Sequence, residues 1–230
     1  MKLLSVNVGR PRPNPWRGGR EPDGWTGIDK RPVEGAVAVA APGAEGTGEV
    51  GLAGDRVYDV AHHGGADQAV YAYAREDLDR WQRELGRPLG NGAFGENLTT
   101  VGVDVNGALI GERWRVGADV VLEVSCPRIP CGTFQGWMGL RGWNRRFTQA
   151  GLPGAYLRVI TPGEIRAGDP VAVVRRPAHG VSVAYTFRAV TTEAEWLPSL
   201  LEVAELPAFV REFARGRVER RRGRGGRATE

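Results

Sequence analysis

Glycine and proline interrupt this chain so often that long regular elements are excluded over most of its length. The 230 residues include 34 glycines and 15 prolines, and both residue types mark turns. Strand-forming runs lie between these turns at 3–8, 113–116, 120–125, 156–160 and 171–175. Many short strands at such spacing predict a mainly β fold, in which the strands close into a barrel.

Helical patterns are confined to a few segments. Between 74 and 85, Leu78, Trp81 and Leu85 share one face of a predicted helix, which Gly86 ends. Beyond 177 glycine becomes rare until Gly216, and 192–201 and 207–217 have helical patterns. We therefore predict a mainly β barrel domain with a few short helices at 1–177, a small helical domain at 178–222, and a disordered tail at 223–230.

The charge balance is uneven. The formal net charge is +4, and 41% of the residues are hydrophobic, enough for a core. Arginines crowd the C-terminal end, and without 211–230 the chain is slightly acidic. A solvated helix end is the simpler interpretation of this arginine run, and phosphate binding is the alternative. Nucleic acid is therefore not the expected partner.

The sequence contains no segment that predicts membrane insertion or export. No apolar run approaches the roughly 20 residues of a membrane span, and the apolar start at 3–6 is too short for a signal peptide. Only two cysteines are present. We expect a cytoplasmic protein with reduced thiols and no membrane contact.

Those two cysteines frame the run Cys126-Pro-Arg-Ile-Pro-Cys131, which directly follows a predicted strand. Two prolines stiffen the loop, and Arg128 would lower the pKa of a neighbouring thiol and favour a thiolate that binds soft metals. The alternatives are a buried structural cysteine and a disulfide, which a reducing compartment disfavours. Structural zinc would need about four ligands, and the cysteines and histidines have no standard spacing. From these residues alone, a functional and a structural Cys131 are evenly balanced.

Two further polar segments are candidates for binding. In His62-His63-Gly64-Gly65-Ala66-Asp67 the glycine pair would let the backbone approach an anion closely. A polar turn before a strand is the alternative. The second segment, 94–99, carries Glu96 and Asn97, and Glu96 could instead cap backbone amides.

Taken together and in order, several segments resemble the MOSC domain, which is shared with the C-terminal region of molybdenum-cofactor sulfurases, and most closely its YiiM-like subfamily. The segment 181–222 resembles the small three-helix domain of YiiM-like proteins. The matching segments within 3–175 are Ser5-Val6-Asn7-Val8-Gly9, Gly27-Ile28-Asp29-Lys30-Arg31-Pro32-Val33, Gly51-Leu52-Ala53-Gly54-Asp55, His63-Gly64-Gly65-Ala66-Asp67, Phe94-Gly95-Glu96-Asn97-Leu98, Ile110-Gly111-Glu112, Pro127-Arg128-Ile129-Pro130-Cys131, Gly154-Ala155-Tyr156-Leu157-Arg158 and Gly168-Asp169.

The resemblance implies a MOSC-type β-barrel that holds the molybdenum cofactor, molybdopterin, with Cys131 as catalytic residue and molybdenum ligand. The family pattern requires no cysteine at Cys126, and Gln68 stands where a basic residue is usual. The family is also associated with pyridoxal phosphate, to which no residue is assigned here. The residues implied in cofactor binding are cations for the phosphate (Lys30, Arg31, Arg128, Arg158), partners for the pterin (Asp67, Glu96, Asn97) and the segment His63, Gly64 and Gly65.

The implied activity is reduction of small N-hydroxylated substrates such as hydroxylaminopurines and amidoximes. No Gly-x-Gly-x-x-Gly fingerprint for a dinucleotide follows a predicted strand, so we expect electrons from a separate flavin-type reductase. A molybdenum-cofactor carrier or sulfur-transfer protein with a persulfide on Cys131 is the alternative. Formation of a homodimer is left open.

Overall fold

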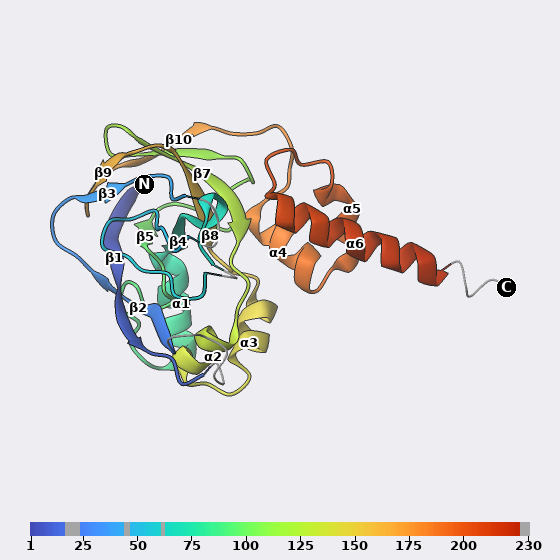
Figure 1. Cartoon of the computed structure of the whole chain (residues 1–230), viewed down its shortest axis with the longest axis horizontal. Coiled ribbons are helices and arrows are strands. Elements are labelled where there is room, and N and C mark those ends of the chain that lie inside the picture. Colours follow the sequence, from blue (N-terminus) through green and yellow to red (C-terminus); the bar gives the residue numbers. More distant parts are fainter. Residues whose placement is uncertain (17–23, 44–46, 61–62, 226–230) are drawn as a thin grey trace.

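The computed structural model of the chain describes residues 1–16, 24–43, 47–60 and 63–225, with side chains up to 221. Its main element is an eight-stranded sheet in the order β10-β6-β7-β8-β4-β5-β1-β2 (Figure 1). Neighbouring strands are antiparallel except for the parallel pair β4–β5, so the sheet is mixed. The strands are β1 (Lys2–Pro13), β2 (Trp25–Pro32), β4 (Val70–Ala74), β5 (Leu98–Val101), β6 (Arg113–Val116), β7 (Val120–Pro127), β8 (Ala155–Thr161) and β10 (Val171–Arg175).

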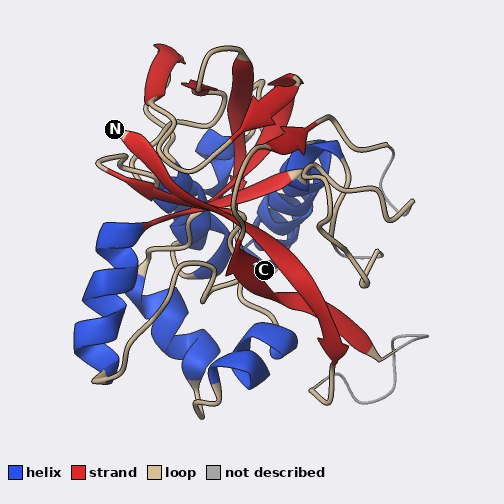
Figure 2. Ribbon diagram, turned by 90° about the vertical axis from the view of Figure 1, so that its left-hand side faces the viewer, coloured by secondary structure: helices blue, strands red, loops and turns tan. Residues whose placement is uncertain are grey.

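The sheet is not closed into a barrel, so the predicted MOSC-type β-barrel is corrected to an open, strongly twisted sheet. The first residues of β1 approach β10 through a single bridge between Lys2 and Pro170 and a few backbone hydrogen bonds. Pro170 has no N–H group with which to extend a ladder. From Asn7 to Pro13, with a register shift between Arg10 and Arg12, β1 pairs with β2 as a long two-stranded arm (Figure 2).

This arm includes much of the segment 9–26, whose many proline, glycine and arginine residues are typical of a loop. β1 runs to Pro13 and β2 begins at Trp25, and the residues that join them at 17–23 lie outside the described part of the chain. A separate two-stranded sheet pairs β3 (Val37–Val39) with β9 (Gly163–Ile165). The prolines and arginines of 9–16 concealed strand structure, because an arm with little covering it needs no alternation of apolar side chains.

Three helices pack around an aromatic core, and the last two of them lie at the lower end of the molecule in Figure 1. They are α1 (Arg75–Leu85), α2 (Gly132–Met138) and α3 (Trp143–Ala150). The predicted helix at 74–85 corresponds to α1, which ends at Gly86 in the left-handed conformation. The central ring is that of Phe94, whose centroid lies 5.3 Å from Phe134 and 5.6 Å from Trp143. These edge-to-face contacts hold α2 against the turn that precedes β5.

The C-terminal helices pack beside β7, and α6 extends away from the sheet (Figure 1). They are α4 (Val183–Thr191), α5 (Leu197–Leu200) and α6 (Ala208–Gly225), with a short 3-10 turn at Ala194–Trp196. Their buried apolar side chains are continuous with the core of the sheet. α6 includes 223–225 of the predicted tail, and 226–230 lie outside the described residues. No helix in the described ranges is long and apolar enough to cross a membrane.

Removing one ring from the aromatic core tests its contribution to stability. Phe147 is fully buried and contacts the rings of Phe134 and Trp143. We expect Phe147→Ala to lower the free energy of unfolding by about 3–5 kcal/mol, because it leaves a cavity. Urea denaturation measures this value. The control Val174→Ala, at a side chain that is 49% exposed, should change it by less than about 0.5 kcal/mol, and a similar small effect for Phe147→Ala would contradict the packing.

Candidate functional site

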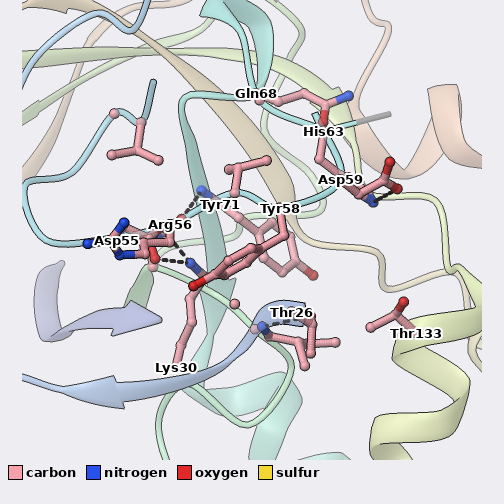
Figure 3. A pocket seen from close by; sticks show the side chains of 18 of the residues that line it. Thr26, Lys30, Asp55, Arg56, Tyr58, Asp59, His63, Gln68, Tyr71 and Thr133 are labelled. Carbon is pink, nitrogen blue, oxygen red and sulfur yellow. Dashed lines mark hydrogen bonds and ion pairs between the residues drawn. The ribbon is translucent and has the colours of Figure 1, made fainter. Parts of the chain in front are cut away.

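A polar pocket of about 130 Å³ opens where β2, the loop 49–59, the segment after His63 and the end of β7 meet (Figure 3). Among its lining residues are six that the sequence predicts as site residues. They come from distant parts of the chain, and the long-range strand pairing brings them together. They are Lys30, His63, Gly64, Asn97, Arg128 and Cys131.

Two glycines allow the loop to lie directly on the strands. A Cβ atom at Gly27 would lie 2.4 Å from the carbonyl oxygen of Arg56, and one at Gly9 would lie 2.7 Å from a carboxylate oxygen of Asp55. Both distances are too short for any side chain. The wall of the pocket therefore depends on these two positions in β1 and β2.

Asp55 connects three segments of this wall. Its carboxylate accepts hydrogen bonds from Lys30 Nζ at 2.5 Å, from Asn97 Nδ2 at 2.7 Å and from the backbone N–H of Gly9 at 2.8 Å. The Lys30 and Asp55 side chains are only 9% and 6% exposed. The charge of Lys30 is thus already balanced by Asp55, which sequence reasoning did not select although it lies in one of the matching segments.

Arg128 brings a positive charge into the pocket. The residue is buried, its Nη1 donates to the carbonyl oxygen of Phe94 at 2.6 Å, and its guanidinium lies 3.8 Å from the ring centroid of Phe134. Burial would lower the pKa of Arg128, but Tyr71, Tyr156 and Cys131 outweigh burial and raise it. Within the described ranges no carboxylate forms an ion pair with this guanidinium. Arg128 therefore offers charge-assisted hydrogen bonds to an anion at this part of the wall, whereas Glu49, Asp55 and Asp59 line other parts.

Cys131 precedes α2 and lines the same pocket. Burial raises the pKa of its thiol, but the hydrogen bond from His63, the charge of Arg128 and the N–H of Phe134 outweigh burial and lower the pKa to about 6. At neutral pH the sulfur is therefore mainly a thiolate. His63 itself lies beside Asp59, with 3.9 Å between Nε2 and a carboxylate oxygen. The neighbouring His62 lies outside the described residues.

The second cysteine has different surroundings. Cys126 is buried in β7 and does not line this pocket. Burial raises the pKa of its thiol to about 12. Both cysteines are free, so the structure contains no disulfide bond between Cys126 and Cys131. The two thiols of the run are thus chemically distinct.

The other predicted site residues do not line the pocket. Arg158 forms ion pairs with Asp67 and with Glu123, the latter at 3.0 Å. Arg31 pairs at the surface with Asp29 at 2.6 Å. Gly65, with φ of 73°, precedes the 3-10 turn Ala66–Gln68.

Glu96 lies inside the fold, where its carboxylate binds backbone N–H groups, and it does not line the pocket. It is fully buried, and burial raises its pKa. Its carboxylate accepts hydrogen bonds from the N–H groups of Gly92 at 2.5 Å and Phe94 at 2.9 Å and from Thr99 Oγ1 at 2.9 Å. These contacts match the alternative in which Glu96 caps backbone amides.

Sequence reasoning missed the aromatic side of the pocket. Tyr71 and Tyr156 are paired across β4 and β8, and their ring centroids lie 5.2 Å apart. Tyr71 donates its hydroxyl to the carbonyl oxygen of Pro153 at 2.7 Å. Only strand register brings these tyrosines together, and one sequence does not reveal that register. Gln68 and Thr133 were also missed as lining residues.

The ionisation of Cys131 can be measured by alkylation. In a Cys126→Ser variant, we expect the rate of reaction with iodoacetamide to reach half its maximum near pH 6, because the thiol pKa is lowered to about 6. His63→Ala in the same background should move this midpoint to a higher pH, because the thiolate loses a hydrogen-bond donor. A midpoint near the ordinary value of about 8.5 in the parent would contradict the described environment.

Comparison with known proteins agrees with this geometry. The MOSC domain family matches residues 59–172. The uncharacterized protein YflK of Bacillus subtilis is 34% identical over 81% of this chain and 79% of its own length. A protein of Gibberella moniliformis named "Reductase" is 32% identical over 68% of this chain, but this chain spans only 28% of that protein.

Among solved structures, YiiM from Geobacillus stearothermophilus superposes with a TM-score of 0.74 at 30% identity. The match covers 94% of this chain and 98% of that one. The sequence match and the shared fold therefore agree over nearly the whole length. The chain belongs to the MOSC domain family and is YiiM-like in sequence and fold.

Proposed function

We propose that the protein is a molybdenum-cofactor-dependent oxidoreductase that reduces N-hydroxylated compounds such as hydroxylaminopurines and amidoximes. The observation that carries the proposal is Cys131, a thiolate beside the buried Arg128 at the wall of a polar pocket. A soft thiolate and a buried cation are the partners that a sulfur-ligated metal and an anionic cofactor need.

The residues of the pocket fit such a cofactor. Cys131 offers one sulfur, and a metal held by one protein sulfur needs further ligands from its cofactor, as a dithiolene provides. Arg128 offers a positive charge that no carboxylate of the described residues pairs, and the exposed Arg56 adds a second cation at the pocket. Lys30 and Asn97 are engaged by Asp55 and would shape the wall. We therefore assign the anionic group of the cofactor to Arg128 and Arg56 rather than to Arg31 or Arg158.

The reaction breaks one N–O bond. R–NH–OH, two electrons and two protons give R–NH₂ and water. The bound cofactor would supply the two-electron change at the metal. The protein would orient the N–OH group near Cys131, and His63, which lines the pocket, would deliver a proton to the departing oxygen. Electrons would come from a separate flavin-type reductase; the relative named "Reductase" is much longer than the matched region and has room for further domains.

The test compares the two cysteines as matched variants. Protein produced with molybdenum is assayed for benzamidoxime reduction with reduced viologen as electron donor. We expect Cys131→Ser to lose about 100-fold or more in rate, because the metal loses its protein ligand. Cys126 is buried and lies outside the Cys131 pocket, although it lines the neighbouring apolar cavity. Because serine keeps the approximate size of its side chain, Cys126→Ser should lose no more than about threefold. Equal activity of wild type and Cys131→Ser would contradict the proposal.

A cofactor carrier or sulfur-transfer protein is the second candidate, and the low pKa of Cys131 also favours it, because a thiolate accepts sulfur readily from a persulfide donor. Molybdenum content and cyanide-labile sulfur, measured on natively purified protein, separate the two. Molybdenum near one per chain supports the oxidoreductase. Metal-free protein with labile sulfur that disappears in Cys131→Ser would favour the carrier.

A further inference from the structure

A second cavity, of about 390 Å³, lies between the sheet and the C-terminal helices. Its lining differs in character from the first, because it is mainly apolar. It combines residues that follow or belong to the sheet with residues from both long C-terminal helices. These residues include Pro127, Ile129, Tyr156, Val190, Phe209 and Phe213.

Three of these large apolar side chains line the cavity and are also partly exposed to solvent. Ile129 is 47% exposed, and Phe209 and Phe213 are each 44% exposed. The two phenylalanines are four residues apart on α6, so they share one helical face. Apolar side chains that gather at an exposed cavity indicate a binding surface more often than scattered ones do.

The apolar cavity adjoins the Cys131 pocket. His63, Gln68 and Tyr156 line both, and Figure 3 shows Gln68 and His63 next to each other at one side of the pocket. A ligand whose reacting end lies at Cys131 and which extends past these three side chains would place its other end between Ile129 and α6.

Gln68 adds a polar requirement at this junction. Its Oε1 atom is buried and has no hydrogen-bond partner within the described part of the chain. A buried carbonyl oxygen without a donor is costly, so such atoms are normally satisfied. An N–H group of a ligand that passes from one cavity to the other would satisfy it.

We propose that this cavity is the specificity site of the reductase, and that it receives a flat aromatic ring whose N–OH group enters the Cys131 pocket while an adjacent N–H donates to Gln68. The inference rests on the proposed function and narrows its substrates to ring-bearing amidoximes and N-hydroxylated aminoheterocycles. The rings of Tyr156, Phe209 and Phe213 favour an aromatic occupant over an aliphatic one.

Equilibrium binding and turnover together test the inference with the full chain loaded with cofactor. The probes are benzamidoxime, acetamidoxime, which lacks the ring, and benzaldoxime, which lacks the N–H group. Ile129→Ala and Phe213→Ala should weaken benzamidoxime binding about 3- to 10-fold, because apolar contact area is lost, and leave the KM for acetamidoxime unchanged. The matched control is Ile160→Ala, at a side chain 40% exposed and outside the cavity, which should have no effect on either probe.

Gln68→Leu keeps the approximate size of the side chain and removes the acceptor. It should weaken benzamidoxime about 5- to 10-fold, as loss of one hydrogen bond predicts, and leave benzaldoxime unchanged. Unchanged benzamidoxime affinity in Ile129→Ala, Phe213→Ala and Gln68→Leu would overturn the inference, even if all three variants reduce amidoximes. Binding with the expected variant pattern but without turnover would instead contradict the proposed function.

Sedimentation of wild type and Phe213→Ala tests whether a second copy of the chain, rather than a ligand, occupies the apolar cavity. If the apolar cavity is an interface between two copies, wild type will be dimeric, Phe213→Ala monomeric, and benzamidoxime will not compete with association. That result would also overturn the inference. A common oligomeric state for both proteins, together with the expected binding pattern, supports it.

Discussion

The chemistry of the pocket depends on one buried positive charge. Arg128 is held against the face of Phe134 and by the carbonyl oxygen of Phe94, so its charge is met by a π face and a dipole rather than by a carboxylate in the described residues. This charge helps to keep Cys131 ionised despite burial. The proposed cofactor would place its anionic group near the same guanidinium.

The position of that charge follows from the aromatic core and the register of the strands. Phe94 and Phe134 pack edge to face at 5.3 Å, which fixes the start of α2 against the turn before β5. Cys131 lies directly before this helix. At another part of the wall, Asp55 accepts hydrogen bonds from Lys30 and Asn97, so contacts between distant segments form both parts of the pocket.

Much of this arrangement follows from the sequence, but not all of it. Turn residues and apolar runs predict a mainly β fold and α1, because both signals are local. The open sheet was predicted as a barrel because closure is decided by a few hydrogen bonds around Pro170, which have no local signature. α4 (Val183–Thr191) lies in the predicted helical domain but was not predicted as a separate helix, because most of its residues are β-branched or aromatic types that favour strands.

Some of the predicted site residues meet at the pocket, and others lie elsewhere in the fold. Cys131, Arg128, His63 and Asn97 are brought together as the matching segments imply. Arg158 and Glu96 instead form contacts that stabilise the fold, because a charged residue in a motif can serve a structural neighbour as well as a ligand. The pairing of Tyr71 with Tyr156 depends on strand register, which a single sequence does not contain.

The central claim is that the Cys131 sulfur binds molybdenum. X-ray absorption at the molybdenum edge counts sulfur ligands directly and does not depend on substrate or electron donor. The account predicts one sulfur ligand fewer in Cys131→Ser than in wild type, and no change in Cys126→Ser. The same sulfur count in wild type and Cys131→Ser would contradict it.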